Sequence, residues 1–177
     1  LADVYAFIGN SLLKPMTQTA TVGLDPEFWE AFPSFEDAKV RVALAACKAY
    51  ALAACAKGEQ QALTDVAVEY TRLFVGPPSP AAPPWETIYR AGGASVGFGE
   101  ATFQMRQLLR ERGLRLSNEN NQYEDHMGIE LLYLSELCRT QDAPAVQSFA
   151  VAHPSSWIDA FAAKVTESFP QGYYAAL

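Results

Sequence analysis

Cysteine and histidine are scarce in this sequence, and their positions exclude several kinds of site. Three cysteines and two histidines occur in 177 residues. Cys47 and Cys55 stand eight positions apart on one predicted helix, about 12 Å along its axis, which is too far for a disulfide. No pair of cysteines has the spacing of zinc ligands. The cysteines are therefore predicted to be reduced core residues.

Long apolar runs are also missing. No run approaches the roughly 20 residues that a membrane-spanning helix needs, and no secretory signal is recognisable. The formal net charge of −7 disfavours nucleic acid and anionic membranes and favours a cationic partner. We therefore expect a cytoplasmic protein without stable membrane insertion. The chain opens with Leu1 and stops at Leu177 within an apolar segment, a pattern consistent with incomplete ends.

Alternating strand patterns and internal repeats are absent, whereas apolar residues recur three and four positions apart in most segments. Asp25 before Pro26 marks a helix start, and Ser34 with Asp37 forms a capping pattern before an alanine-rich helix that stops at Gly58. Pro144 and Pro154 start two later helices. The sequence thus predicts an all-α fold, a single-domain bundle of about eight to ten helices over residues 1–177.

The most apolar helix follows a charged cluster at residues 124–126. Asp125 can cap this helix while His126 satisfies a nearby carbonyl group. Alternatively, His126 and Glu130 stand at i,i+4 and could hold a metal ion with a third ligand, for which His153 is the other histidine in the sequence. Both interpretations remain open at the level of sequence.

A proline-rich loop precedes Trp85. Five prolines follow Gly76 by position 84, which predicts a stiff, extended loop. With Leu73, Phe74 and Trp85 beside it, this loop could form one wall of an apolar groove, although periodicity alone favours a core position for Phe74. The glycines at 92, 93, 97 and 99 lack the ending of a phosphate-binding loop and predict a turn.

Three blocks of the sequence together resemble the TorD/DmsD family of cytoplasmic chaperones for redox enzymes that use the twin-arginine export route. They are EYTRLFVGP at 69–77, APPWETIY at 82–89 and EDHMGIEL at 124–131. The resemblance extends more loosely to His153, Trp157 and the Tyr173-Tyr174 pair. The sequence departs from the family at two places. The family often has proline where this chain has Tyr123, and many members have an aromatic pair where this chain has Leu12-Leu13.

The resemblance implies an all-helical, non-enzymatic protein that binds the twin-arginine signal peptide and the apoprotein of a molybdopterin-dependent oxidoreductase. Such a protein aids cofactor insertion, delays export and needs no cofactor or metal of its own. A monomer is expected, with a domain-swapped dimer as the alternative. The residues carried over by the resemblance, together with acidic neighbours that could pair with arginine, form the expected peptide-binding site: Leu73, Phe74, Gly76, Pro77, Pro84, Trp85, Glu86, Glu124, Asp125 and His126.

Two expectations follow for experiments. Asp125→Ala is expected to weaken peptide binding by roughly 2 to 4 kcal/mol and to leave the fold intact. The competing hypotheses are a helical metal-dependent hydrolase that uses His126 and Glu130, and a nucleotide-binding regulator, for which the sequence shows no phosphate-binding loop. The client reductase is not identifiable from the sequence.

Overall fold

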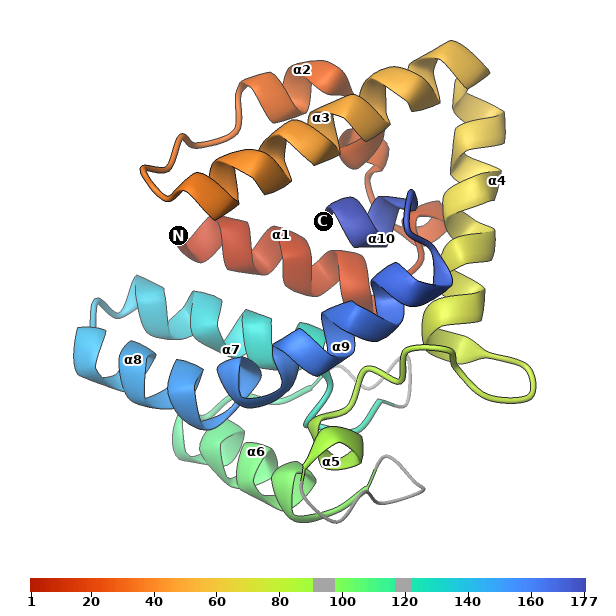
Figure 1. The fold of residues 1–177 in the computed structure, drawn as a ribbon. Helices are drawn as coiled ribbons and strands as arrows, with labels where there is room; N and C mark the ends of the chain where they lie inside the picture. The colour runs from red at the N-terminus through yellow and green to blue at the C-terminus, as the bar shows by residue number, and fades with distance from the viewer. Residues whose placement is uncertain (91–97, 117–121) are drawn as a thin grey trace. The chain divides into compact units, whose positions relative to one another are not determined.

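The computed structural model describes residues 1–90, 98–116 and 122–177, and most of these residues are helical (Figure 1). Ten α-helices and one isolated β-bridge occur there, which confirms the predicted all-α fold. The polar residues 118–122 also predict a loop, of which 118–121 lie outside the described residues, as do the glycines at 92, 93 and 97. The elements are α1 (Ala2–Leu13), η1 (Met16–Gln18), η2 (Thr21–Leu24), α2 (Pro26–Glu30), α3 (Ala38–Lys57), α4 (Glu59–Tyr70), η3 (Thr71–Val75), α5 (Glu86–Tyr89), α6 (Glu100–Glu111), α7 (Met127–Arg139), α8 (Ala143–Ala152), α9 (Pro154–Ser168) and α10 (Tyr173–Ala176).

The chain divides into two compact units. The first unit contains Leu1–Lys14 and Pro83–Phe161, and the second contains Pro15–Ala82 and Ala162–Leu177. One boundary lies in the proline-rich loop and another lies within α9. The assignment of residues 1–177 to one domain stays a prediction.

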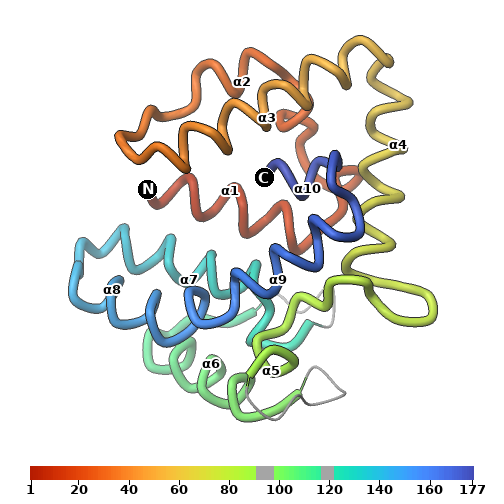
Figure 2. The backbone as a smooth tube through the Cα atoms, viewed as in Figure 1, coloured from red at the N-terminus to blue at the C-terminus, as the bar shows by residue number. Residues whose placement is uncertain are grey.

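In the first unit, α7 is the central helix. Nine of its thirteen residues are buried, including Met127, Leu131 and Leu134. It packs against α1, and α8 returns beside it (Figure 2). A helix buried on most of its faces has little room for polar side chains, so the polar groups that α7 does bury must find partners inside the protein.

The close packing of α1 on α7 depends on two glycines that face each other. A Cβ atom added to Gly9 would lie 2.7 Å from the carbonyl oxygen of Gly128, and one added to Gly128 would lie 2.6 Å from the carbonyl oxygen of Gly9. Both distances are shorter than any van der Waals contact allows. The two backbones therefore approach each other directly, without side chains between them.

The helix starts in the second unit follow the predicted capping chemistry, with one shift. Asp25 accepts a hydrogen bond from the Glu27 N–H at 2.8 Å and caps α2. The cap of α3 is Asp37, which accepts from the N–H groups of residues 39 and 40, and not Ser34 as the capping pattern suggested. Gly58, with a φ of +93°, ends α3 at the predicted position.

A buried carboxylate organises the end of the chain in the second unit. Glu69 on α4 accepts hydrogen bonds from the backbone N–H groups of Tyr173 and Tyr174 at 2.9 and 2.8 Å. These are first-turn N–H groups of α10, which no backbone carbonyl of the helix can satisfy. Burial raises the pKa of Glu69 more than these two hydrogen bonds lower it. Glu69 thus acts as a long-range cap for α10.

The burial of the cysteines differs from the sequence-based expectation that all three lie in the core. All three cysteines are free, but only Cys47 is buried, whereas Cys55 is exposed. Cys55 lies about 100° around α3 from the buried Ala54, at the edge of the inward face.

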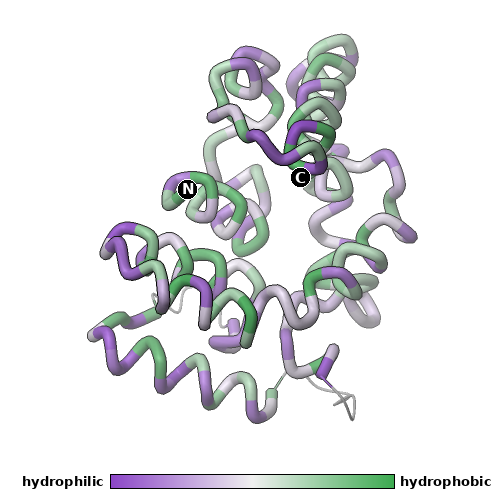
Figure 3. Tube along the Cα trace, turned by 60° about the vertical axis from the view of Figure 1, so that its left-hand side comes forward, coloured by the Kyte–Doolittle hydropathy of each residue, from purple (hydrophilic) through white to green (hydrophobic). Residues whose placement is uncertain are grey.

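Hydrophilic and hydrophobic residues alternate along the helices of both units (Figure 3).

The helices of the described residues are too short or too polar to cross a membrane.

Candidate functional site

Asp125 is the centre of a buried hydrogen-bond network in the first unit. Its side chain is fully buried. One carboxylate oxygen accepts from the Thr87 N–H at 3.0 Å and from the Thr87 hydroxyl at 2.6 Å, and the other accepts from the Thr102 hydroxyl at 2.9 Å. Thr87 belongs to α5 and Thr102 to α6. Asp125 therefore ties the segment before α7 to two other helices.

Two backbone hydrogen bonds join the segment that contains Trp85 to the segment that contains Asp125. The Glu86 N–H donates to the Asp125 carbonyl at 3.0 Å, and the Met127 N–H donates to the Pro84 carbonyl at 2.8 Å. These bonds form the isolated antiparallel bridge of the fold. The predicted site residues Pro84, Trp85 and Asp125 are thus direct neighbours in space, although about 40 positions separate them along the chain.

His126, and not Asp125, caps α7. Its Nδ1 atom accepts a hydrogen bond from the Gly128 N–H at 3.0 Å, so this ring nitrogen is the acceptor that caps the helix. The ring is almost fully buried, and burial lowers the pKa of His126 to about 3. The imidazole is therefore neutral in the folded protein at physiological pH.

Glu86 and Glu130 meet in a second buried cluster. Glu86 forms an ion pair with Arg90 at 2.6 Å, and its other oxygen lies 2.9 Å from Nδ1 of His153. Burial alone would raise the pKa of Glu86, but the hydrogen bonds with His153 and Arg90 outweigh it and hold this pKa below its ordinary value. Glu130 has the opposite shift: burial, followed by the nearby charge of Glu86, raises its pKa well above the ordinary value.

An exposed aromatic cluster lies beside these buried groups. Phe98 packs against Phe103 and Tyr123, with ring centroids 5.1 and 5.4 Å apart, and Tyr123 lies 6.3 Å from Trp85. Phe98, Phe103 and Tyr123 are 40, 54 and 41% exposed. The guanidinium group of Arg106 lies 5.7 Å from the centroid of the Phe103 ring. We call Trp85, Phe98, Phe103 and Tyr123 the aromatic cluster.

Of the aromatic cluster, the sequence analysis selected only Trp85. A signal for Phe103 was nevertheless present, because Met105 and Leu109 form the buried stripe of α6 and position 103 lies about 200° away from position 105 around the helix. An aromatic residue out of phase with the apolar stripe of its helix is exposed. The proximity of Phe98 and Tyr123 depends on tertiary structure.

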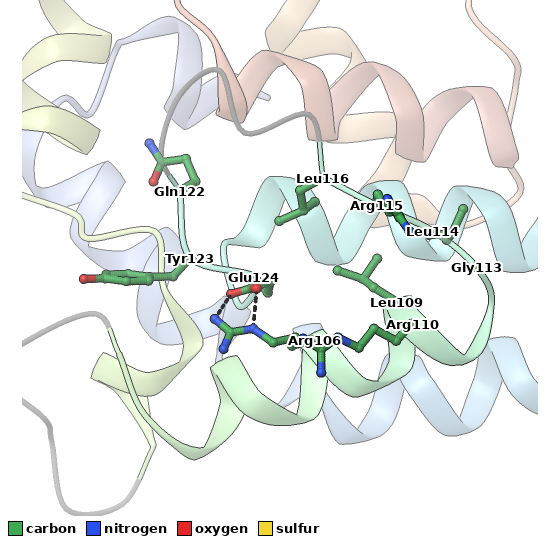
Figure 4. Close-up of a pocket in the computed structure, with 10 residues that line it drawn as sticks. All are labelled: Arg106, Leu109, Arg110, Gly113, Leu114, Arg115, Leu116, Gln122, Tyr123 and Glu124. Atoms are coloured by element: carbon green, nitrogen blue, oxygen red, sulfur yellow. Dashed lines mark hydrogen bonds and ion pairs between the residues drawn. The ribbon is translucent and has the colours of Figure 1, made fainter.

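A polar pocket of about 710 Å³ opens next to Tyr123 (Figure 4). Arg106 and Glu124 form a bidentate ion pair across it, with N···O distances of 2.6 and 3.0 Å. Burial alone would raise the pKa of Glu124, but Arg106, a backbone hydrogen bond and Arg110 together hold it below its ordinary value. Unlike Asp125 and Glu86, Glu124 keeps 17% of its side chain exposed. The pocket is lined by Arg106, Leu109, Arg110, Gly113, Leu114, Arg115, Leu116, Gln122, Tyr123 and Glu124.

Four predicted site residues lie in the second unit. Leu73 and Phe74 are buried in the π-helical turn η3, where Phe74 packs edge-on against Tyr174. Gly76 follows with a φ of +82°, and Pro77 is exposed and lines a pocket of about 450 Å³ beside α4. The direct contact of these residues with a peptide stays a prediction, as it does for the six predicted residues of the first unit.

Comparison with known proteins places the chain in a family. Residues 35–163 match the family model described as nitrate reductase delta subunit. The chain is 32% identical over 123 residues to the chaperone protein TorD of Shewanella pealeana, an alignment that covers 66% of this chain and 56% of TorD. It is 30% identical over 108 residues to the Tat proofreading chaperone DmsD of Salmonella typhimurium, covering 61% of this chain and 52% of DmsD.

The aligned region spans just over half the length of these curated relatives. Among solved structures, a candidate redox enzyme maturation protein from Archaeoglobus fulgidus matches with a TM-score of 0.49 and 24% identity, covering 86% of this chain and 82% of that one. The family model and the two curated relatives confirm the resemblance that the three sequence blocks indicated. The chain belongs to the nitrate reductase delta subunit family, together with the TorD and DmsD chaperones.

Proposed function

We propose that this protein is a cytoplasmic chaperone, and not an enzyme, for a redox enzyme that carries a twin-arginine signal peptide. It binds the signal peptide and the apoprotein of a molybdopterin-dependent oxidoreductase, aids cofactor insertion and delays export. Family membership and the names of the relatives, a chaperone protein and a Tat proofreading chaperone, support this proposal. A monomer is the expected state, and a domain-swapped dimer is the alternative.

The observation that carries the proposal is the aromatic cluster with a carboxylate beside it. A twin-arginine signal offers two guanidinium groups followed by an apolar run. Exposed aromatic rings that already contact one another form a preassembled apolar surface, a common feature of protein-binding sites. The apolar run would cover Phe98, Phe103 and Tyr123.

Glu124 is the carboxylate best placed for an arginine of the signal peptide. Asp125 and Glu86 are fully buried and engaged by internal donors, whereas Glu124 is partly exposed and adjacent to Tyr123. Its present partner, Arg106, shows that the carboxylate accepts a bidentate guanidinium group. A peptide arginine would replace Arg106 in an equivalent arrangement. Asp125 then stabilises the site from the protein interior, through its hydrogen bonds with Thr87 and Thr102.

Calorimetric titration with a synthetic twin-arginine signal peptide tests this proposal. Phe103→Ala removes the most exposed ring of the aromatic cluster and should weaken binding by more than about 1 kcal/mol, about fivefold. Val151→Ala removes an even more exposed apolar side chain from α8 and should leave the affinity unchanged. Equal affinities for the two variants would exclude the aromatic cluster as the binding surface.

The hydrolase hypothesis needs His126 and Glu130 on one metal ion, but the group of potential metal ligands found among the described residues contains Glu130 without His126. His126 uses Nδ1 for the Gly128 N–H, and its ring is 1% exposed, so neither a metal ion nor a substrate reaches it from solvent in this conformation. One oxygen of Glu130 accepts from the Trp157 indole N–H, and its carboxyl group lies beside the Glu86 carboxylate. For the nucleotide hypothesis, three of the four relevant glycines lie outside the described residues.

A further inference from the structure

We infer that Glu86, Glu130 and His153 form a binding site for a divalent transition-metal ion of the zinc class, which stabilises the first unit and takes no part in catalysis. One ligand atom from each of the three residues lies within 4.8 Å of the other two. All three side chains are buried. They come from α5, α7 and the junction between α8 and α9, so one ion would join three parts of the unit.

The orientation of the two carboxylates supports this inference. In Glu86, one oxygen is held by the Arg90 guanidinium group and the other faces Nδ1 of His153. In Glu130, one oxygen accepts from the Trp157 indole N–H at 3.1 Å, and the other has no donor among the described residues, since its neighbour Glu86 is itself an acceptor. Each carboxylate thus has one oxygen oriented by a donor, as the outer shell of a metal site requires. The unpartnered buried oxygen of Glu130 is the atom that a cation would satisfy.

The donor set selects the class of ion. One imidazole nitrogen and two carboxylate oxygens suit Zn²⁺ and related transition ions, whereas Mg²⁺ and Ca²⁺ prefer oxygen ligands alone. Two carboxylates balance the double positive charge of the ion. Arg90 does not prevent this, because its side chain is 32% exposed and its charge remains in contact with water.

A pocket beside the three residues gives a metal ion access to His153 but does not form an active site. His153 lines a pocket of about 530 Å³ between α6, α7 and α8, together with Tyr133 and Phe149. An ion can approach His153 through this pocket. The three ligand residues themselves are at most 6% exposed, so a substrate cannot approach a bound ion. The site is structural, and it is independent of the proposed function.

Zinc uptake by the full chain is the direct test. Protein treated with chelator is incubated with Zn²⁺ alone, passed through a desalting column and analysed for metal. We expect about one zinc ion per chain and a rise in the thermal unfolding midpoint, because an ion that binds only the folded state stabilises it. Absence of retained zinc, or several ions per chain without a rise in the midpoint, would overturn the inference.

A pair of variants on α7 localises the ion. Glu130→Gln keeps the shape of the side chain and an acceptor for Trp157 but removes the ligand charge, so zinc affinity should fall at least tenfold. Glu136→Gln, which removes a carboxylate from the same helix outside the cluster, should bind zinc as the native chain does. Circular dichroism verifies that both variants are folded. Equal affinities would overturn the assignment.

The native chain offers a test that does not depend on the folding of a variant. It has two histidines, and nitrogen chemical shifts of their imidazole rings report metal ligation separately. On addition of Zn²⁺, the signals of His153 should move and those of His126 should not, since Nδ1 of His126 is engaged by Gly128. Unmoved signals of His153 would refute the site even if the protein retained zinc elsewhere.

Discussion

Two adjacent acidic residues have different surroundings and, we propose, different tasks. Asp125 is fully buried and accepts three hydrogen bonds from Thr87 and Thr102. Glu124, one position earlier, reaches a pocket and pairs with Arg106. Neighbouring residues outside a helix can face opposite directions. Asp125 therefore supports the site from inside, and Glu124 is the residue available to a partner.

Variants of these two residues should separate stability from binding. Asp125→Ala leaves the buried donors of Thr87 and Thr102 without an acceptor, so we expect the free energy of unfolding to fall by about 2 to 4 kcal/mol. Glu124→Gln should change stability by less than about 1 kcal/mol and weaken signal-peptide binding several-fold. Urea denaturation and calorimetry measure the two effects. Loss of binding in a fully stable Asp125→Ala protein would restore the sequence-based expectation of a direct contact.

His126 makes stability depend on pH. Its pKa is lowered to about 3 in the folded protein, whereas an ordinary histidine titrates near 6.5. The unfolded chain therefore binds a proton more readily, and the stability contributed by the neutral ring is present above pH 6.5 and lost as the pH falls. We expect the free energy of unfolding to be about 2 kcal/mol lower at about pH 5 than at pH 7 from this residue alone.

Asparagine provides the control for this pH dependence, because its side chain also accepts the capping hydrogen bond but does not titrate. In His126→Asn, the difference in unfolding free energy between the two pH values should shrink by about the contribution of the histidine. Urea denaturation of both proteins at each pH gives the comparison. An unchanged pH dependence would show that His126 is protonated in the folded state or accessible to solvent.

At the scale of elements, the contact between α1 and α7 decides the core of the first unit. Gly9 and Gly128 let the two backbones meet, and His126 and Asp125 fix the start of α7 at that point. The sequence analysis offered Asp125 as the cap of this helix, whereas His126 caps it. The helix begins at Met127 because residues 124–126 are used for the bridge, the ion pair and the cap.

Gly9→Ala tests the close approach of these two helices. Its methyl group would lie 2.7 Å from the Gly128 carbonyl oxygen, so the helices must separate and the core loses contacts. We expect a loss of about 2 to 4 kcal/mol in the free energy of unfolding, even though alanine favours helices. Asn10→Ala, at an exposed position of α1, should change stability by less than about 1 kcal/mol in thermal or urea denaturation. Similar stabilities would show that α1 moves without cost.

For the whole molecule, charge is the property that matters most for the proposed cationic signal peptide. The formal net charge is −7, which raises the local concentration of a positively charged peptide. Three arginines line the pocket next to the aromatic cluster, so attraction must come from the wider acidic surface and from Glu124 rather than from the pocket as a whole. Charge then affects mainly the rate of association.

The salt dependence of binding measures this contribution. The association rate of a twin-arginine peptide should fall several-fold between about 0.05 and 0.5 M salt, because the screening length shortens from more than 10 Å to a few ångströms. The dissociation rate should change less, since it depends on the apolar contacts. Stopped-flow measurements at several salt concentrations distinguish the two rates. An association rate independent of salt would contradict long-range attraction.

The amino-acid sequence by itself determined the helical architecture and the family. Apolar periodicity, Pro and Gly punctuation and capping residues such as Asp25 act over a few positions, so they are visible in the chain without its fold. The three blocks that carried the family resemblance are likewise local, and the family model confirmed them. The spacing of Cys47 and Cys55 excluded a disulfide between them, and both are free.

Only the tertiary structure decided which of the singled-out residues face solvent. Trp85 and Asp125 become neighbours through backbone hydrogen bonds between segments about 40 positions apart, and the aromatic cluster is assembled from three separate stretches. The meeting of Glu86, Glu130 and His153 has the same origin. Burial and proximity depend on how the helices pack. Side chains far apart in the sequence contribute to this packing as much as near neighbours do, so no local sequence pattern encodes it.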